Sequence, residues 1–125
     1  MQSRAVSPPN LVVVIDADAA VRNSLKFSLE VEGFDVHAYA GAGPLLDEAE
    51  LPRCGCLIID YHLPGMNGLA ALDILRRRGM QIPAILITSH PNSAMRARAA
   101  AAGVAIVEKP LLGSALLDAV HDAII

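Results

Sequence analysis

Aromatic residues are scarce in this chain of 125 residues, which has two Phe, two Tyr and no Trp. Its hydrophobic fraction is nevertheless 54%, so the core must be built from aliphatic side chains. A chain of this length forms one domain that buries a substantial core. We therefore expect a single domain at residues 11–125, preceded by a disordered leader at residues 1–10.

Long apolar runs and extended basic runs are also missing. The longest apolar run, residues 99–107, is far too short to span a membrane, and residues 1–4 lack the apolar segment of a signal peptide. The formal net charge is −3 and the only basic run, residues 76–78, is typical of a solvated helix end. The sequence thus predicts a cytoplasmic protein without membrane contact or direct binding of nucleic acid.

Cysteine is limited to Cys54 and Cys56. On a strand, residues two apart point to the same face, but two ligands without further Cys or paired His make a poor metal site. We expect small core residues in a reducing compartment.

Apolar runs alternate with segments of helical spacing. The expected strands cover residues 11–15, 34–38 (an edge strand), 56–60, 83–87 and 104–107. Five helices are expected. The first places Val21, Leu25 and Leu29 on its inner face and ends at Gly33, and the second begins at Pro44. The third and fourth cover residues 67–78 and 93–102, and the last places Leu112, Leu116 and Val120 on its inner face. Five such repeats with short connections predict an α/β fold with a parallel sheet covered on both faces.

The most informative stretch is residues 56–68, where an apolar run ends at Asp60 and a loop with Pro64, Gly65 and Gly68 follows. At the carboxyl end of a buried parallel strand, a carboxylate lies where open α/β sheets bind ligands. Asp also begins turns, so this stretch alone leaves both interpretations open.

Four expected strands end in polar residues: Asp16, Asp60, Thr88 and Lys109. Because parallel strands end at one edge, these four side chains are predicted to converge. A carboxylate can attack phosphorus, carboxylates bind Mg²⁺, and a hydroxyl and an ammonium can hold phosphoryl oxygens. The pattern therefore favours phosphoryl-transfer chemistry.

Residues 57–68 strongly resemble the phosphoacceptor segment of response-regulator receiver domains, and the segments 87–89 and 107–110 resemble the family's switch hydroxyl and Lys-Pro motifs. Residues 66–69 are most similar to nitrogen-fixation-regulator-type receivers. This resemblance implies a flavodoxin-like doubly wound sheet with strand order 2-1-3-4-5 and five helices. It also implies a phosphoprotein of two-component signalling or a phosphorelay, a switch rather than a turnover enzyme.

Residue by residue, the resemblance makes Asp60 the acceptor of a phosphoryl group from a histidine kinase or phosphotransfer protein. It places Mg²⁺ against Asp16, Asp60 and the backbone carbonyl of His62. Thr88 and Lys109 would hold the phosphoryl group. Pro110 would follow a cis peptide bond, which costs little before proline.

Two positions depart from the family pattern. The second of two usual adjacent acids, a direct metal ligand, is Ala17 here, which predicts weak Mg²⁺ binding. Asp18 either caps the first helix, the interpretation we favour, or replaces the missing ligand. The aromatic switch position is Ile106, which can still pack inward or outward but would signal differently to partners.

Other functions remain open at this stage. Ala17 favours a degenerate receiver that acts as a phosphorylation-independent interaction module. Asp16-Ala17-Asp18 also resembles the Asp-x-Asp motif of haloacid-dehalogenase-type phosphatases, although that leaves Asp60 without a role. We further expect the fourth helix, fifth strand and last helix, including Leu117 and Ile124, to form a partner surface suited to a homodimer. His90 is treated as an exposed loop residue.

Overall fold

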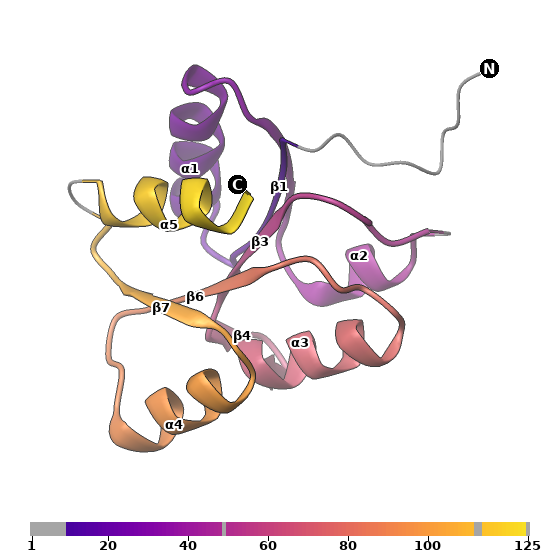
Figure 1. Ribbon diagram of the computed structural model, residues 1–125, viewed down its shortest axis with the longest axis vertical. Helices are drawn as coiled ribbons and strands as arrows, with labels where there is room; N and C mark the ends of the chain where they lie inside the picture. Colours follow the sequence, from indigo (N-terminus) through magenta and orange to yellow (C-terminus); the bar gives the residue numbers. More distant parts are fainter. Residues whose placement is uncertain (1–9, 49, 112–113, 125) are drawn as a thin grey trace.

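The protein is described by a computed structural model that covers residues 10–48, 50–111 and 114–124. Its centre is a parallel five-stranded sheet (Figure 1). The strands are β1 (Leu11–Ile15), β2 (Asp35–Tyr39), β3 (Cys56–Asp60), β6 (Ala84–Thr88) and β7 (Ala105–Glu108). Their order is β2-β1-β3-β6-β7, which confirms the expected order 2-1-3-4-5. The predicted leader, apart from Asn10, lies outside the described residues.

Burial of the strands follows their position in the sheet. Every residue of the three central strands β1, β3 and β6 is buried, as expected for Val-, Ile- and Leu-rich strands covered on both faces. The edge strands β2 and β7 include exposed residues. The carboxyl ends of the central strands are therefore shielded on both sides.

The helices cover the two faces of the sheet (Figure 1). They are α1 (Ala19–Val31), α2 (Ala42–Leu46), α3 (Gly68–Arg77), α4 (Ser93–Ala101) and α5 (Ala115–Ile124). The core has two parts. Leu25 of α1 and Leu116 of α5 belong to one, whereas Leu45 of α2, Leu69 of α3 and Met95 of α4 belong to the other. This is the doubly wound arrangement that the alternating sequence predicts.

Helix α2 begins earlier than expected. Pro44 was predicted at the first helical position, but the helix starts at Ala42 after the N-cap Gly41. Pro44 is the third residue of α2 and is tolerated in its first turn, because the first backbone N–H groups of a helix have no intrahelical acceptor. Position 112, which was expected on the inner face of the last helix, lies outside the described residues.

Cys54 does not share a strand with Cys56. Strand β3 begins at Cys56, which is fully buried, and Cys54 precedes it half-buried in the connection. Gly55 between them has φ 108°, and a Cβ there would lie 2.1 Å from the carbonyl oxygen of Leu11. This left-handed turn breaks the strand, so the expected shared face of the two thiols was wrong.

The loop after Asp60 has regular structure that the sequence did not indicate. Two short antiparallel strands, β4 (His62–Leu63) and β5 (Met66–Asn67), form a hairpin. Gly65 turns this hairpin with φ 83°, and Asn67 then caps α3 by accepting a hydrogen bond from the backbone N of Ala70. The hairpin fixes the path of the chain beside Asp60.

Large apolar side chains that are exposed in the described part of the chain are Phe27, Val31 and Met66, none of which lies on α4, β7 or α5. Leu117 and Ile124 are half-buried and pack against the core under α1 and α5. The expected partner surface is therefore less apolar than predicted. Among the described residues, no helix combines the length and apolar character needed to cross a membrane.

Candidate functional site at the carboxyl edge of the sheet

Four polar side chains meet at the carboxyl edge of the central strands. Asp16 follows β1, Asp60 ends β3 and Thr88 ends β6, and all three are buried in an otherwise apolar interior. Lys109 follows β7 and directs its ammonium to both carboxylates. Its Nζ lies 3.0 Å from Asp16 Oδ2 and 3.1 Å from Asp60 Oδ2. The ion pairs thus bring Asp16, Asp60 and Lys109 together, while Thr88 ends its strand at the same edge of the sheet.

Backbone pairing holds these residues in place. The N–H of Asp16 donates to the carbonyl of Tyr39 at 3.1 Å, which extends the pairing of β1 with β2 past the strand end. The N–H of Lys109 donates to the carbonyl of Thr88 at 2.8 Å, which extends β7 along β6. The Lys109–Pro110 peptide bond is cis, as expected. The side chains therefore project from a rigid sheet edge.

The electrostatic balance of the site rests on Lys109. Burial alone would lower the pKa of its ammonium, but the hydrogen bonds and charges of Asp16 and Asp60 outweigh burial and raise that pKa above its ordinary value. Lys109 therefore stays charged and compensates two buried carboxylates. The remaining negative charge is suited to a further cation or to an approaching electrophile.

Asp18 caps the first helix rather than facing the pocket. Its side chain is exposed and accepts a hydrogen bond from the backbone N of Ala20 at 2.9 Å. Its own N–H donates to Asp16 Oδ1 at 2.9 Å. Asp18 thus acts as the helix cap that we favoured, because its carboxylate accepts a hydrogen bond from the first turn of α1.

Arg22 is a residue of the site that sequence reasoning missed. Its Nη1 donates to the carbonyl oxygens of Asp16 at 2.8 Å and Ala17 at 3.2 Å. A positive charge near the N-terminus of a helix interacts unfavourably with the helix dipole. The presence of an arginine at this position was therefore a sign that Arg22 has another role. Arg22 clamps the turn that carries Asp16.

The remaining predicted site residues are His62, Thr88 and Ile106, of which His62 contacts Asp60. The backbone N–H of His62 donates to Asp60 Oδ1 at 3.3 Å, and His62 itself is exposed to solvent. Thr88 Oγ1 accepts from the N–H of His90 at 3.4 Å, and the side chain of His90 is exposed. Ile106 is half-buried against the core under α2, α3 and α4. Thr88 therefore contacts the loop that follows β6, and Ile106 contacts the core on the α2, α3 and α4 face.

The oxygen donors present suit a divalent cation only in part. The carboxylates of Asp16 and Asp60 and the carbonyl of His62 are hard oxygen ligands of the kind that Mg²⁺ prefers. Ala17 contributes no ligand, and the described residues contain no group of three or more acidic, His or Cys side chains placed to hold a metal. These oxygen donors thus fit an ion that keeps several of its waters.

Comparison with known proteins agrees with this geometry. Residues 12–121 match the family described as response regulator receiver domain. The chain is 37% identical over 116 residues to the transcriptional regulatory protein FixJ of Azorhizobium caulinodans, covering 91% of this chain and 55% of that protein. It is 33% identical over 116 residues to the response regulator protein TodT of Pseudomonas putida, covering 92% of this chain and 51% of that protein. The chain thus spans about half the length of these curated relatives.

Solved structures lead to the same fold. The response regulator StyR superposes with a TM-score of 0.83 at 34% identity, covering 91% of this chain and 58% of that one. The structure of FixJ-N gives a TM-score of 0.80 at 32% identity, covering 91% of this chain and 92% of that one. Similarity of this extent covers the sheet, the helices and the carboxyl edge that carries the four polar residues.

Proposed function

Because the chain belongs to the response regulator receiver domain family, we propose that it accepts a phosphoryl group on Asp60 and acts as a signalling switch. One observation carries this proposal. A single ammonium, that of Lys109, bridges carboxylates from the ends of two parallel strands, with the buried hydroxyl of Thr88 on the strand between β3 and β7. This arrangement combines a nucleophile with groups that can neutralise phosphoryl oxygens.

In the proposed step, a carboxylate oxygen of Asp60 attacks the phosphorus of a phosphohistidine on a histidine kinase or phosphotransfer protein. The P–N bond breaks, an O–P bond forms, and the imidazole leaves with the electron pair of the broken bond. Lys109 and Thr88 would then hold phosphoryl oxygens, because both are already placed at the carboxyl edge. The product is an acyl phosphate on Asp60.

Mg²⁺ would be held by Asp16, Asp60 and the backbone carbonyl of His62. When bound, such an ion neutralises phosphoryl charge as the group transfers. Weak binding follows from Ala17, which leaves the position of the second acid without a ligand. We place the switch in the cytoplasm, where the free thiols of Cys54 and Cys56 remain reduced.

The test is phosphorylation by a small donor. The protein is incubated with acetyl phosphate and Mg²⁺ and weighed intact by mass spectrometry, beside Asp60→Asn. We expect the wild-type protein to gain one phosphoryl group and the variant to gain none. A phosphoryl group that persists in Asp60→Asn would overturn the assignment of the acceptor.

A second function, a phosphorylation-independent interaction module, is favoured by one feature. Lys109 already compensates both carboxylates while Ala17 removes a metal ligand, so the pocket is stable without phosphorylation. This function predicts that the wild-type protein stays unmodified under the same conditions while Ala17→Asp becomes phosphorylated. A wild-type protein that is modified at Asp60 would exclude it.

A further inference from the structure

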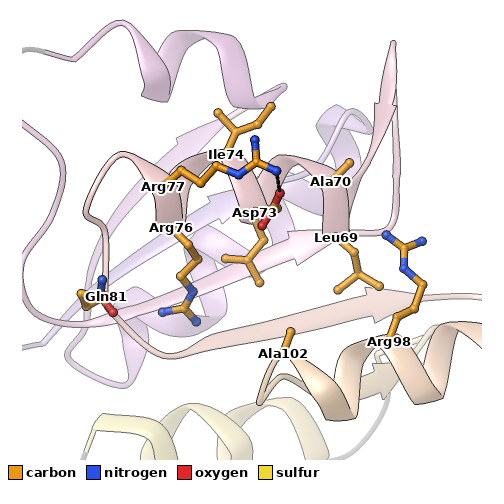
Figure 2. A pocket seen from close by; sticks show the side chains of 10 residues that line it. Leu69, Ala70, Asp73, Ile74, Arg76, Arg77, Gln81, Arg98 and Ala102 are labelled. Atoms are coloured by element: carbon orange, nitrogen blue, oxygen red, sulfur yellow. Dashed lines mark hydrogen bonds and ion pairs between the residues drawn. The ribbon is translucent and has the colours of Figure 1, made fainter.

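A groove separates α3 from α4 on the face of the sheet that also carries α2 (Figure 2). Its volume is about 780 Å³. Leu69 and Leu72 of α3 belong to its lining, with Ala102 at the end of α4. Figure 2 shows Arg76 and Gln81 toward one end of the groove and Arg98 near Leu69 toward the other. Leu69 and Leu72 are 6% and 2% exposed, so the groove combines apolar walls that belong largely to the core with a guanidinium from each helix.

Helix α4 contributes few side chains to the groove. Of its residues only Arg98 belongs to the lining, together with Ala102, which follows the helix. Met95 and Ala99 are the buried residues of α4 and belong to the core. The α4 side of the groove therefore consists of one guanidinium-bearing side chain and one small side chain.

The charge of the groove is one-sided. Arg77 pairs with Asp73 one turn earlier in α3, as the dashed line in Figure 2 marks. Within the part of the chain that the structure describes, Arg76 and Arg98 have no carboxylate partner. No acidic residue occurs between Asp73 and Glu108, although the chain as a whole has a net charge of −3. Asp73, the one acid among the lining residues, is paired with Arg77, so the guanidinium groups of Arg76 and Arg98 leave the groove with an excess of positive charge.

We propose that this groove binds an acidic amphipathic segment of a partner protein, with carboxylates against Arg76 and Arg98 and apolar side chains on the α3 wall. Arginine binds carboxylates through paired N–H groups, and an amphipathic helix in a groove is a recurrent mode of peptide recognition. Nucleic acid is a weaker match, because duplex binders commonly neutralise several phosphates and here two cations flank apolar walls. The inference goes beyond the proposed function, because it needs neither Asp60 nor a phosphoryl group.

The test uses unphosphorylated, ¹⁵N-labelled protein and a synthetic amphipathic helical peptide of Leu, Ala and Glu. We expect amide shifts at Leu69, Asp73, Arg98 and Ala102 that weaken as salt is added. The same peptide with Gln in place of Glu should bind at least about tenfold more weakly, because it lacks the charges that Arg76 and Arg98 would meet.

A matched pair of variants locates the contact. Arg98→Glu and Arg96→Glu change the charge of the same helix equally, but only Arg98 lines the groove. Arg98→Glu should weaken peptide binding by about tenfold or more, and Arg96→Glu by about twofold or less through the long-range field alone. Both side chains are exposed, so folding should be preserved, and Arg76→Gln provides an independent second variant.

Several results would overturn the proposal. These are the absence of shifts with the Glu peptide, equal effects of Arg96→Glu and Arg98→Glu, and shifts produced by a DNA duplex but not by the peptide. Phosphorylation of Asp60 in the Arg98→Glu variant is measured in parallel with acetyl phosphate. Its preservation separates failure of the groove from failure of the proposed receiver function.

Discussion

At the scale of single residues, the site combines two features that act in opposite directions. Lys109 satisfies two buried carboxylates, which stabilises the pocket without a metal ion. Ala17 removes a carboxylate that would otherwise attract one. Lys109, rather than a metal ion, therefore compensates the charge of the two carboxylates. An acid at position 17 should favour the binding of a metal ion.

Restoring the acid at position 17 should strengthen metal binding. Partners outside the direct ligand shell of a metal are already worth on the order of tenfold in affinity. We therefore expect Ala17→Asp to bind Mg²⁺ at least about tenfold more tightly and to react faster with acetyl phosphate. Isothermal titration measures the first effect. The control is Ala20→Asp, which adds the same charge at an exposed position of α1. An Ala17→Asp protein with unchanged affinity would contradict weak binding caused by the missing ligand.

The helix cap at Asp18 leads to a separate prediction. Because its side chain accepts the N–H of Ala20, Asp18→Ala should lower the free energy of unfolding by about 1 kcal/mol. Asp18→Asn keeps an oxygen for the cap and removes the charge, so it should retain most of that stability. Denaturant unfolding and Mg²⁺ titration of both variants provide the measurement. A loss of Mg²⁺ affinity in stable Asp18→Asn would show instead that Asp18 reaches the ion.

The two thiols should differ sharply in reactivity. Burial raises the pKa of Cys56 to about 12, whereas the thiol of an unfolded chain ionises at about 8.5. The native state thus keeps a proton that the unfolded state releases between these values, and the contribution of Cys56 to stability falls as the pH rises through that window. At pH 8, iodoacetamide should modify half-buried Cys54 first and Cys56 only after unfolding. Peptide mapping of native and denatured protein checks this, with Cys54→Ser as the control.

At the scale of elements, α3 is positioned by a glycine. Gly68 is the first residue of α3, and its N–H donates to the carbonyl of Tyr61 at 2.7 Å. A Cβ at this position would lie 2.3 Å from the backbone oxygen of Asp60 and 3.1 Å from a methyl group of Leu86. The helix can therefore approach the end of β3 closely only because residue 68 has no side chain.

Gly68→Ala should consequently lower the free energy of unfolding by about 1–3 kcal/mol, the usual cost of overpacking. It should also slow phosphorylation, because the displaced atom belongs to the backbone of Asp60. Gly43→Ala is the matched control, since Gly43 lies in α2 with nothing within 4 Å of the added Cβ. That variant should be neutral or more stable by up to about 1 kcal/mol. Equal stability of the two variants would contradict the steric argument.

Prediction from the sequence worked where one physical pattern decides the structure. The strands β1, β3 and β6 carry apolar residues on both faces of the sheet, which identifies them as buried strands. Short connections through helices then require these strands to run parallel. It failed where a backbone turn matters more than side-chain pattern. Gly55 turns the chain between two cysteines, and Gly65 turns a hairpin that the sequence pattern did not reveal.

The candidate site was predictable because polar residues interrupt apolar runs at strand ends. The contacts among them were not, since the distances from Lys109 depend on how β7 aligns with β6. The role of Arg22 was hidden for a related reason. Its hydrogen bonds go to backbone carbonyls, and because every residue has a backbone carbonyl, the sequence does not indicate which ones accept them.

At the scale of the whole molecule, charge is distributed unevenly between neighbouring helices. Helix α4 carries exposed Arg96 and Arg98, while α5 carries exposed Asp118 and Asp122. In a two-fold dimer built on α4, β7 and α5, the α4 of one protomer could meet the α5 of the other, so each charge pair would occur twice. Charge complementarity thus supports the homodimer surface that the sequence suggested, although Leu117 and Ile124 are more buried than expected.

The dimer prediction concerns phosphorylated protein. We expect self-association to strengthen after treatment with acetyl phosphate and Mg²⁺, as measured by sedimentation velocity. Asp122→Arg should weaken that association by about tenfold or more, because two repulsive contacts replace two attractive ones in a symmetric interface. Arg96→Asp should act similarly, and the double variant Arg96→Asp with Asp122→Arg should recover part of the affinity. Glu32→Arg, at an exposed acid just past the end of α1, is the control and should leave association unchanged. A phosphorylated protein that stays monomeric, or a double variant no better than either single variant, would contradict pairing of α4 with α5.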